Sequence, residues 1–116
     1  MATYKGFNER VGRGGFLVTK DGQALSPGKS QKVWNHSPNG FNWGYGGSGP
    51  AQLALALLLE ETDKDTAVRL YQRFKWEVVA PIPLGFESSC VSEAWELTSG
   101  QIQNWLKRQP GLQQEG

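Results

Sequence analysis

The chain has 116 residues, of which 38% are hydrophobic and 20% are charged, and its formal net charge is +1. This composition is typical of a single globular domain with a modest core, and it excludes an intrinsically disordered chain. The small net charge argues against nucleic acid as a partner, because the protein has no basic field that would attract a polyanion.

The sequence predicts a cytoplasmic protein with no membrane partner. Its longest apolar run, residues 54–59, is too short to cross a bilayer, and residues 1–15 lack the apolar segment of a signal peptide. Cys90 is the only cysteine, so an intrachain disulfide is excluded and a reducing compartment is favoured.

The N-terminal residues predict strands. Residues 3–7 have the aromatic and β-branched content of a short strand, and residues 16–19 and 23–25 are expected to form a hairpin. Asp21 and Gly22 suit its tight turn, which needs positive φ angles. The residues between the first strand and the hairpin are expected to form a mobile basic loop.

Residues 26–49 form a long connection rich in Ser, Pro, Gly and Asn, with aromatic residues among them. A connection of this length in a small domain is either functional or contains an element that the pattern does not reveal. We expect it to be mostly ordered, because its aromatic rings would be costly to leave in water.

The next segment predicts a buried central helix. Pro50 suits the first position of a helix, where its missing N–H group has no intrahelical partner, and Gly49 would then be the N-cap. Residues 52–59 are apolar on nearly every side, as expected of a helix at the centre of a domain.

A second helix is expected to start at a capping box formed by Thr62 and Asp65 and to extend to about Val78. The prolines that follow would end it. The acidic residues around this helix–helix turn favour solvation and capping over a metal site. Their positions are Glu60, Glu61, Asp63 and Asp65.

The remaining residues predict a loop at 85–92, a strand at 93–98 and a last helix that starts at a capping box of Thr98 and Gln101. The fold class is therefore α+β, a small antiparallel sheet with three helices and a buried central helix. Residues 1–109 would form a single domain and residues 110–116 a flexible C-terminal tail.

The glycine-rich stretch before the central helix is a candidate anion site. Backbone N–H groups of Gly46, Gly47 and Ser48 would point at a ligand beside the positive end of the helix dipole. The stretch is not a P-loop, because no Lys-Ser or Lys-Thr pair follows it. The alternative is that these glycines only let the loop pack tightly and cap the helix.

Aromatic residues in the same connection strengthen the binding hypothesis, because nucleobases and other flat rings stack on such side chains. Lys32 and His36 are near them in the sequence and could neutralise phosphate groups. The alternative is that Phe41 and Trp43 form a small core beneath the central helix. The candidate ligand-binding residues are Trp34, His36, Phe41, Trp43, Tyr45, Gly46, Gly47, Ser48 and Lys32.

We expect no enzymatic activity and no cofactor. His36 is the only histidine and could act as a general base in a hydrolase, but no motif pairs it with a nucleophile and no metal-ligand spacing occurs. Cys90 has no adjacent cationic residue that would lower its pKa, and we interpret it as inert.

Two segments, NHSPNGFNWGYGGSGPAQLALALLLE at residues 35–60 and RLYQRFKWEVVAPIP at residues 69–83, carry a family resemblance. The chain resembles a family of small bacterial and phage proteins classed as a domain of unknown function, whose hallmark is NHSPxGFxWGYGGSGPAQLALA. The resemblance implies no activity. It does imply a context of phages and mobile elements, where sequestering a ligand or inhibiting a host defence protein is a common task.

The sequence thus favours a small binding protein that holds or sequesters an anionic, nucleotide-like ligand. The alternative is a protein-interaction module that inhibits a host protein, with Trp76 or Trp105 as an anchor. A third, weaker alternative is a nucleic-acid binder. It would use Arg10, Arg13, Lys29 and Lys32. The oligomeric state, including a homo-oligomer, is left open.

Overall fold

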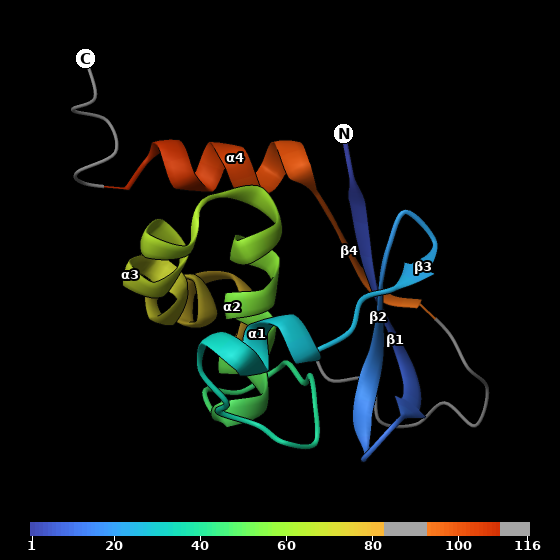
Figure 1. The fold of residues 1–116 in the computed structure, drawn as a ribbon. Coiled ribbons are helices and arrows are strands. Elements are labelled where there is room, and N and C mark those ends of the chain that lie inside the picture. The colour runs from blue at the N-terminus through green and yellow to red at the C-terminus, as the bar shows by residue number, and fades with distance from the viewer. Residues whose placement is uncertain (83–92, 110–116) are drawn as a thin grey trace.

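The computed structural model describes residues 1–82 and 93–109 and has the expected α+β architecture. A four-stranded antiparallel sheet has the strand order β3-β2-β1-β4, and the helices lie to one side of it (Figure 1). No helix in the described residues is long and apolar enough to cross a membrane. The elements are β1 (Thr3–Val11), β2 (Gly15–Lys20), β3 (Gln23–Ala24), α1 (Gly28–Val33), α2 (Ser48–Glu61), α3 (Lys64–Phe74), the π-helix η1 (Lys75–Val79), β4 (Glu93–Thr98) and α4 (Ser99–Lys107).

Strand β1 is longer than the sequence pattern predicts. It pairs with β2 as far as Val11, opposite Gly15, so most of the expected mobile loop is strand. Gly12 and Gly14, with φ of 54° and 114°, make the turn short enough for this pairing. The predicted tight turn of the hairpin is confirmed, because Asp21 and Gly22 both have positive φ, at 51° and 84°.

Helix α2 is the buried centre of the domain, as predicted, with residues 49–58 all buried. It packs between the other helices and the sheet (Figure 1). The predicted start is wrong by two residues: Gly47 is the N-cap, and Pro50 is the third residue of the helix rather than the first. Proline is tolerated there because the first turn has no intrahelical acceptor for its missing N–H.

Of the two predicted capping boxes, one is confirmed and the other is wrong. The capping box of Thr98 and Gln101 is present at the start of α4. At α3 the cap is Asp63 rather than Thr62, since the Asp63 carboxylate accepts from the Thr66 N–H at 2.7 Å. Helix α1 was not predicted. The expectations for residues 85–92, for Cys90 and for the tail at 110–116 lie outside the described residues.

The acidic end of α2 joins the helical layer to the sheet. The Glu61 carboxylate accepts hydrogen bonds from Tyr4 on β1 and from Ser99 and Gln103 on α4. Burial alone would raise the pKa of Glu61, but these hydrogen bonds outweigh it and lower the pKa. Glu60 forms an ion pair with Lys20 at 2.8 Å. These two carboxylates therefore have a structural role.

Candidate ligand-binding site at the N-terminus of helix α2

The structure separates the four aromatic residues of the connection into two groups. Phe41 and Trp43 are each only 2% exposed and belong to the core, where Trp43 packs against Phe16 and Trp95. This corrects the placement of Phe41 and Trp43 among the candidate ligand-binding residues and agrees with the alternative, in which they belong to a core. Trp34 and Tyr45, in contrast, are 55% and 45% exposed.

Gln52 on α2 holds the exposed part of the connection in place. Its buried side chain accepts hydrogen bonds from the N–H groups of His36 at 2.7 Å and Ser37 at 2.9 Å. It donates to the carbonyl of Trp34 at 3.0 Å and to Ser30 Oγ at 2.9 Å. The sequence signal for this role was one polar residue within an apolar helix, because a buried amide needs partners.

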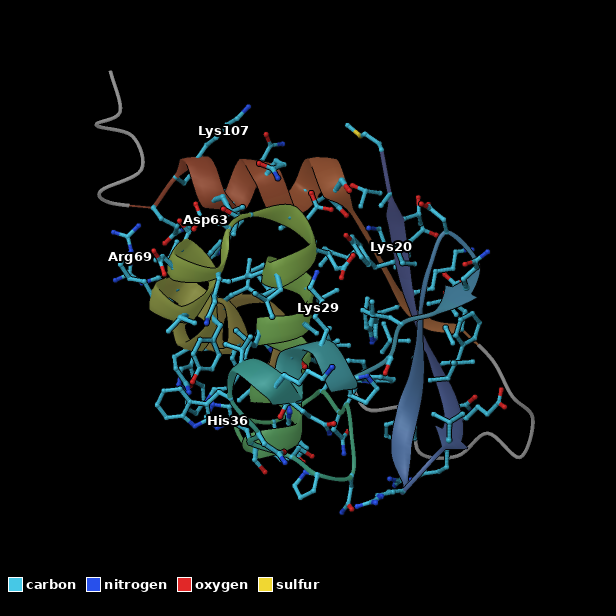
Figure 2. The ribbon with its side chains drawn as sticks, in the orientation of Figure 1. Lys20, Lys29, His36, Asp63, Arg69 and Lys107 are labelled. Atoms are coloured by element: carbon cyan, nitrogen blue, oxygen red, sulfur yellow. The ribbon has the colours of Figure 1, made fainter. Side chains whose placement is uncertain are left out.

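His36 has two aromatic neighbours. Its ring stacks on Trp34, with centroids 5.5 Å apart and planes 3° from parallel. Its Nε2 lies 2.6 Å from the hydroxyl oxygen of Tyr71 on α3. Figure 2 shows His36 on the side of the helices that is away from the sheet. Its side-chain hydrogen bond is therefore to a tyrosine rather than to a serine or cysteine nucleophile.

Burial, and then the positive charge of Lys75, lower the pKa of His36 below its usual value of 6.5. The unfolded chain therefore binds a proton more readily than the folded protein. We expect the free energy of unfolding to fall as the pH drops from about 7.5 to about 5.5. In His36→Gln this part of the pH dependence should be lost. Urea unfolding at several pH values measures how the free energy of unfolding changes with pH in the wild type and in His36→Gln. The same pH dependence in both proteins would contradict the expectation.

Lys75 is the functional candidate that the sequence analysis missed. Lysine side chains are rarely buried, yet Lys75 is only 6% exposed. It is four residues after Tyr71, so the two side chains share a face of the helix. Lys75 Nζ donates to the Gly46 carbonyl at 3.1 Å and lies 4.4 Å from the ring centroid of Trp76. It also begins the π-helix η1, and π turns are frequent at functional sites.

The two glycines at this position accommodate aromatic rings of the protein itself. A Cβ on Gly46 would be 2.2 Å from the Trp76 ring, and a Cβ on Gly47 would be 2.4 Å from the Tyr45 ring. A side chain at either position would therefore displace the exposed ring beside it. Trp76 is 60% exposed, and with Tyr45 it flanks the start of α2.

The start of α2 also differs electrostatically from the starts of α3 and α4. Side chains of Asp63 and Thr98 cap α3 and α4, whereas Gly47 provides no side-chain cap and the first turn of α2 has no acidic residue. The positive end of the α2 dipole is thus left uncompensated, next to the loop that binds the Lys75 ammonium group. Both features favour an anion at this position.

We call these residues together the ring cluster: Trp34, His36, Tyr45, Tyr71, Lys75 and Trp76. Of the remaining predicted residues, Ser48 is exposed at the first position of α2, and Lys32 is exposed in the last turn of α1. Lys32 has no hydrogen bond or ion pair to the cluster. Residues 1–82 and 93–109 contain no group of three side chains suited to holding a metal ion.

The fold and this cluster define a small α+β domain with exposed rings and a buried lysine at the N-terminus of its central helix. The chain belongs to a family of unknown function, DUF6166, whose model matches residues 4–108. No curated protein and no solved structure shows a significant match to the chain. Membership of a family of unknown function is thus confirmed, and it carries no activity with it. The bacterial or phage origin and the hallmark motif stay predictions.

Proposed function

We propose that the protein is a non-enzymatic binding protein that holds a small anionic ligand with a flat ring, most simply a nucleotide or nucleotide-derived signal. The observation that carries this proposal is the buried Lys75 beside the uncapped N-terminus of α2. Two positive groups placed together destabilise the protein unless an anion compensates them. A phosphate at this point would be bound by both.

The exposed rings supply the second half of the recognition. Tyr45 and Trp76 flank the start of α2, and either could stack on a nucleobase, which typically contributes about 1–3 kcal/mol. The neutral His36 and the Tyr71 hydroxyl offer polar atoms to the ligand on the same side of the cluster. A ligand with both an anionic and an aromatic part fits this surface better than inorganic phosphate alone.

The proposed role is sequestration in the cytoplasm. The resemblance to proteins of phages and mobile elements supports it, since removing a nucleotide signal would blunt a host defence that depends on that signal. Sequestration needs only tight binding, which a cation, backbone amides and aromatic rings can provide.

A thermal-shift panel tests the proposal with purified protein. Nucleoside monophosphates and cyclic dinucleotides are compared with the matching neutral nucleosides and with inorganic phosphate. A ligand at a hundredfold excess over its dissociation constant should stabilise the protein by about 2.7 kcal/mol. Nucleosides and phosphate should give much smaller shifts. Mass spectrometry of small molecules released on denaturation then identifies any ligand that copurifies.

A protein partner is the second candidate. Its support is the exposure of Trp34, Tyr45 and Trp76, because aromatic side chains are common anchors of interfaces. Trp105, the other expected anchor, is buried against Phe74 and donates to Glu77, so it is not available. The thermal-shift panel distinguishes the two candidate functions, because the melting temperature of an inhibitor of a host protein would not change with nucleotide.

A further inference from the structure

A concave site lies beside the sheet and shares no residue with the ring cluster. It is a half-open groove of about 540 Å³ between β2, β3, α1 and residues 38–41. In Figure 1, α1 follows β3 and lies on the same side of the strands as the other helices. Its volume is within the range of small-molecule sites, which run from roughly 300 to 1,000 Å³.

Backbone hydrogen bonds join the start of β2 to residues 39–41 on one side of the groove. Gly15 N–H donates to the Asn39 carbonyl and Phe16 N–H to the Phe41 carbonyl, both at 2.9 Å. A Cβ on Gly15 would be 2.7 Å from that Asn39 oxygen, so glycine is needed for this contact. Since these bonds occupy the start of the β2 edge, an added peptide strand could not pair there.

The walls are mainly apolar. Side chains that are only partly buried line it from two directions, Phe16 on β2 and Leu25 after β3, and Phe41 completes the wall from the connection. Apolar surface that stays open to solvent in this way gains free energy when an apolar ligand covers it.

The groove has a charge of one sign. Among the described residues that line it, Arg13, in the turn between β1 and β2, is the only charged one, and none is Asp or Glu. Within the described residues Arg13 has no ion pair. Arg10 differs, because its guanidinium lies 4.3 Å from the Phe16 ring centroid and donates to the Gly14 carbonyl. Arg13 is therefore the cation that is free to bind a ligand.

We infer that this groove binds a small amphiphile that has an apolar chain and a single carboxylate. The apolar chain of the ligand lies against Phe16 and Leu25, and its carboxylate pairs with the Arg13 guanidinium. This is a separate site from the ring cluster, with a different class of ligand.

Isothermal titration of the full chain with octanoate tests the inference, with 1-octanol as the uncharged match. Wild-type protein is expected to bind octanoate at least tenfold more tightly than 1-octanol, since one charge-assisted hydrogen bond contributes about that factor. Arg13→Gln should remove the preference and leave octanol binding within about twofold. If Arg13→Gln binds octanoate and 1-octanol more weakly by the same factor, the pairing of the carboxylate with Arg13 is wrong.

Two substitutions on the exposed strand β3 locate the site. Ala24 lines the groove, so Ala24→Phe should fill it and lower octanoate affinity at least tenfold. Gln23 is the next residue on the same strand and does not line the groove, so Gln23→Phe is the matched control. Equal effects of the two, or no saturable octanoate binding up to about 5 mM, would overturn the inference. Lys75→Met should leave octanoate binding unchanged, which separates this site from the ring cluster.

Discussion

Replacing Gln52 with leucine is expected to lower the free energy of unfolding by about 3–5 kcal/mol. Leucine matches the volume of the buried side chain but removes its hydrogen bonds. The N–H groups of His36 and Ser37 and the Trp34 carbonyl would lose this partner on α2. The His36 N–H and the Trp34 carbonyl would keep only their bond to each other, at 3.2 Å. Each buried group left unsatisfied costs about 1–3 kcal/mol.

Urea unfolding measures this loss, and Gln72→Leu is the control because Gln72 is exposed on α3. The control should change stability by less than about 0.5 kcal/mol. A loss below about 1 kcal/mol in Gln52→Leu would show that residues 34–37 are held to α2 by other contacts.

The second large effect is expected at Leu55, which is fully buried at the middle of α2. Leu55→Ala removes apolar contacts and leaves a cavity in the core, so we expect a loss of about 2–5 kcal/mol. Leu59, on the same helix, is only partly buried and Leu59→Ala should cost clearly less. Thermal or urea unfolding compares the two. Equal losses would contradict a core centred on α2.

The elements that the sequence predicted are those with a local cause. Asp21 and Gly22 set a tight turn, Thr98 and Gln101 form a capping box, and the apolar run at residues 52–59 needs burial on every side. Helix α1 could not be predicted, because it has only six residues and no side-chain cap. Its position depends on packing against α2. Placing Pro50 at the first position predicts a start of α2 that is two residues later than the observed one.

The candidate site was predictable only in part, because exposure is a property of the assembled fold. Trp34 and Trp43 occur in similar sequence surroundings, yet one is exposed and the other is in the core beside Trp95. Lys75 is separated from Gly46 by 29 residues, and their hydrogen bond exists only because η1 packs on the start of α2. Neither fact has a local signal.

Titration of the best nucleotide from the panel into three proteins tests the central claim most directly. Wild type and Lys107→Met, which removes an exposed lysine of α4, should bind it equally well. Lys75→Met should bind it at least tenfold more weakly while remaining folded, since methionine fills a similar buried volume. Equal affinity of all three proteins, or no nucleotide with a dissociation constant below about 1 mM, would contradict an anion site at Lys75 and the N-terminus of α2.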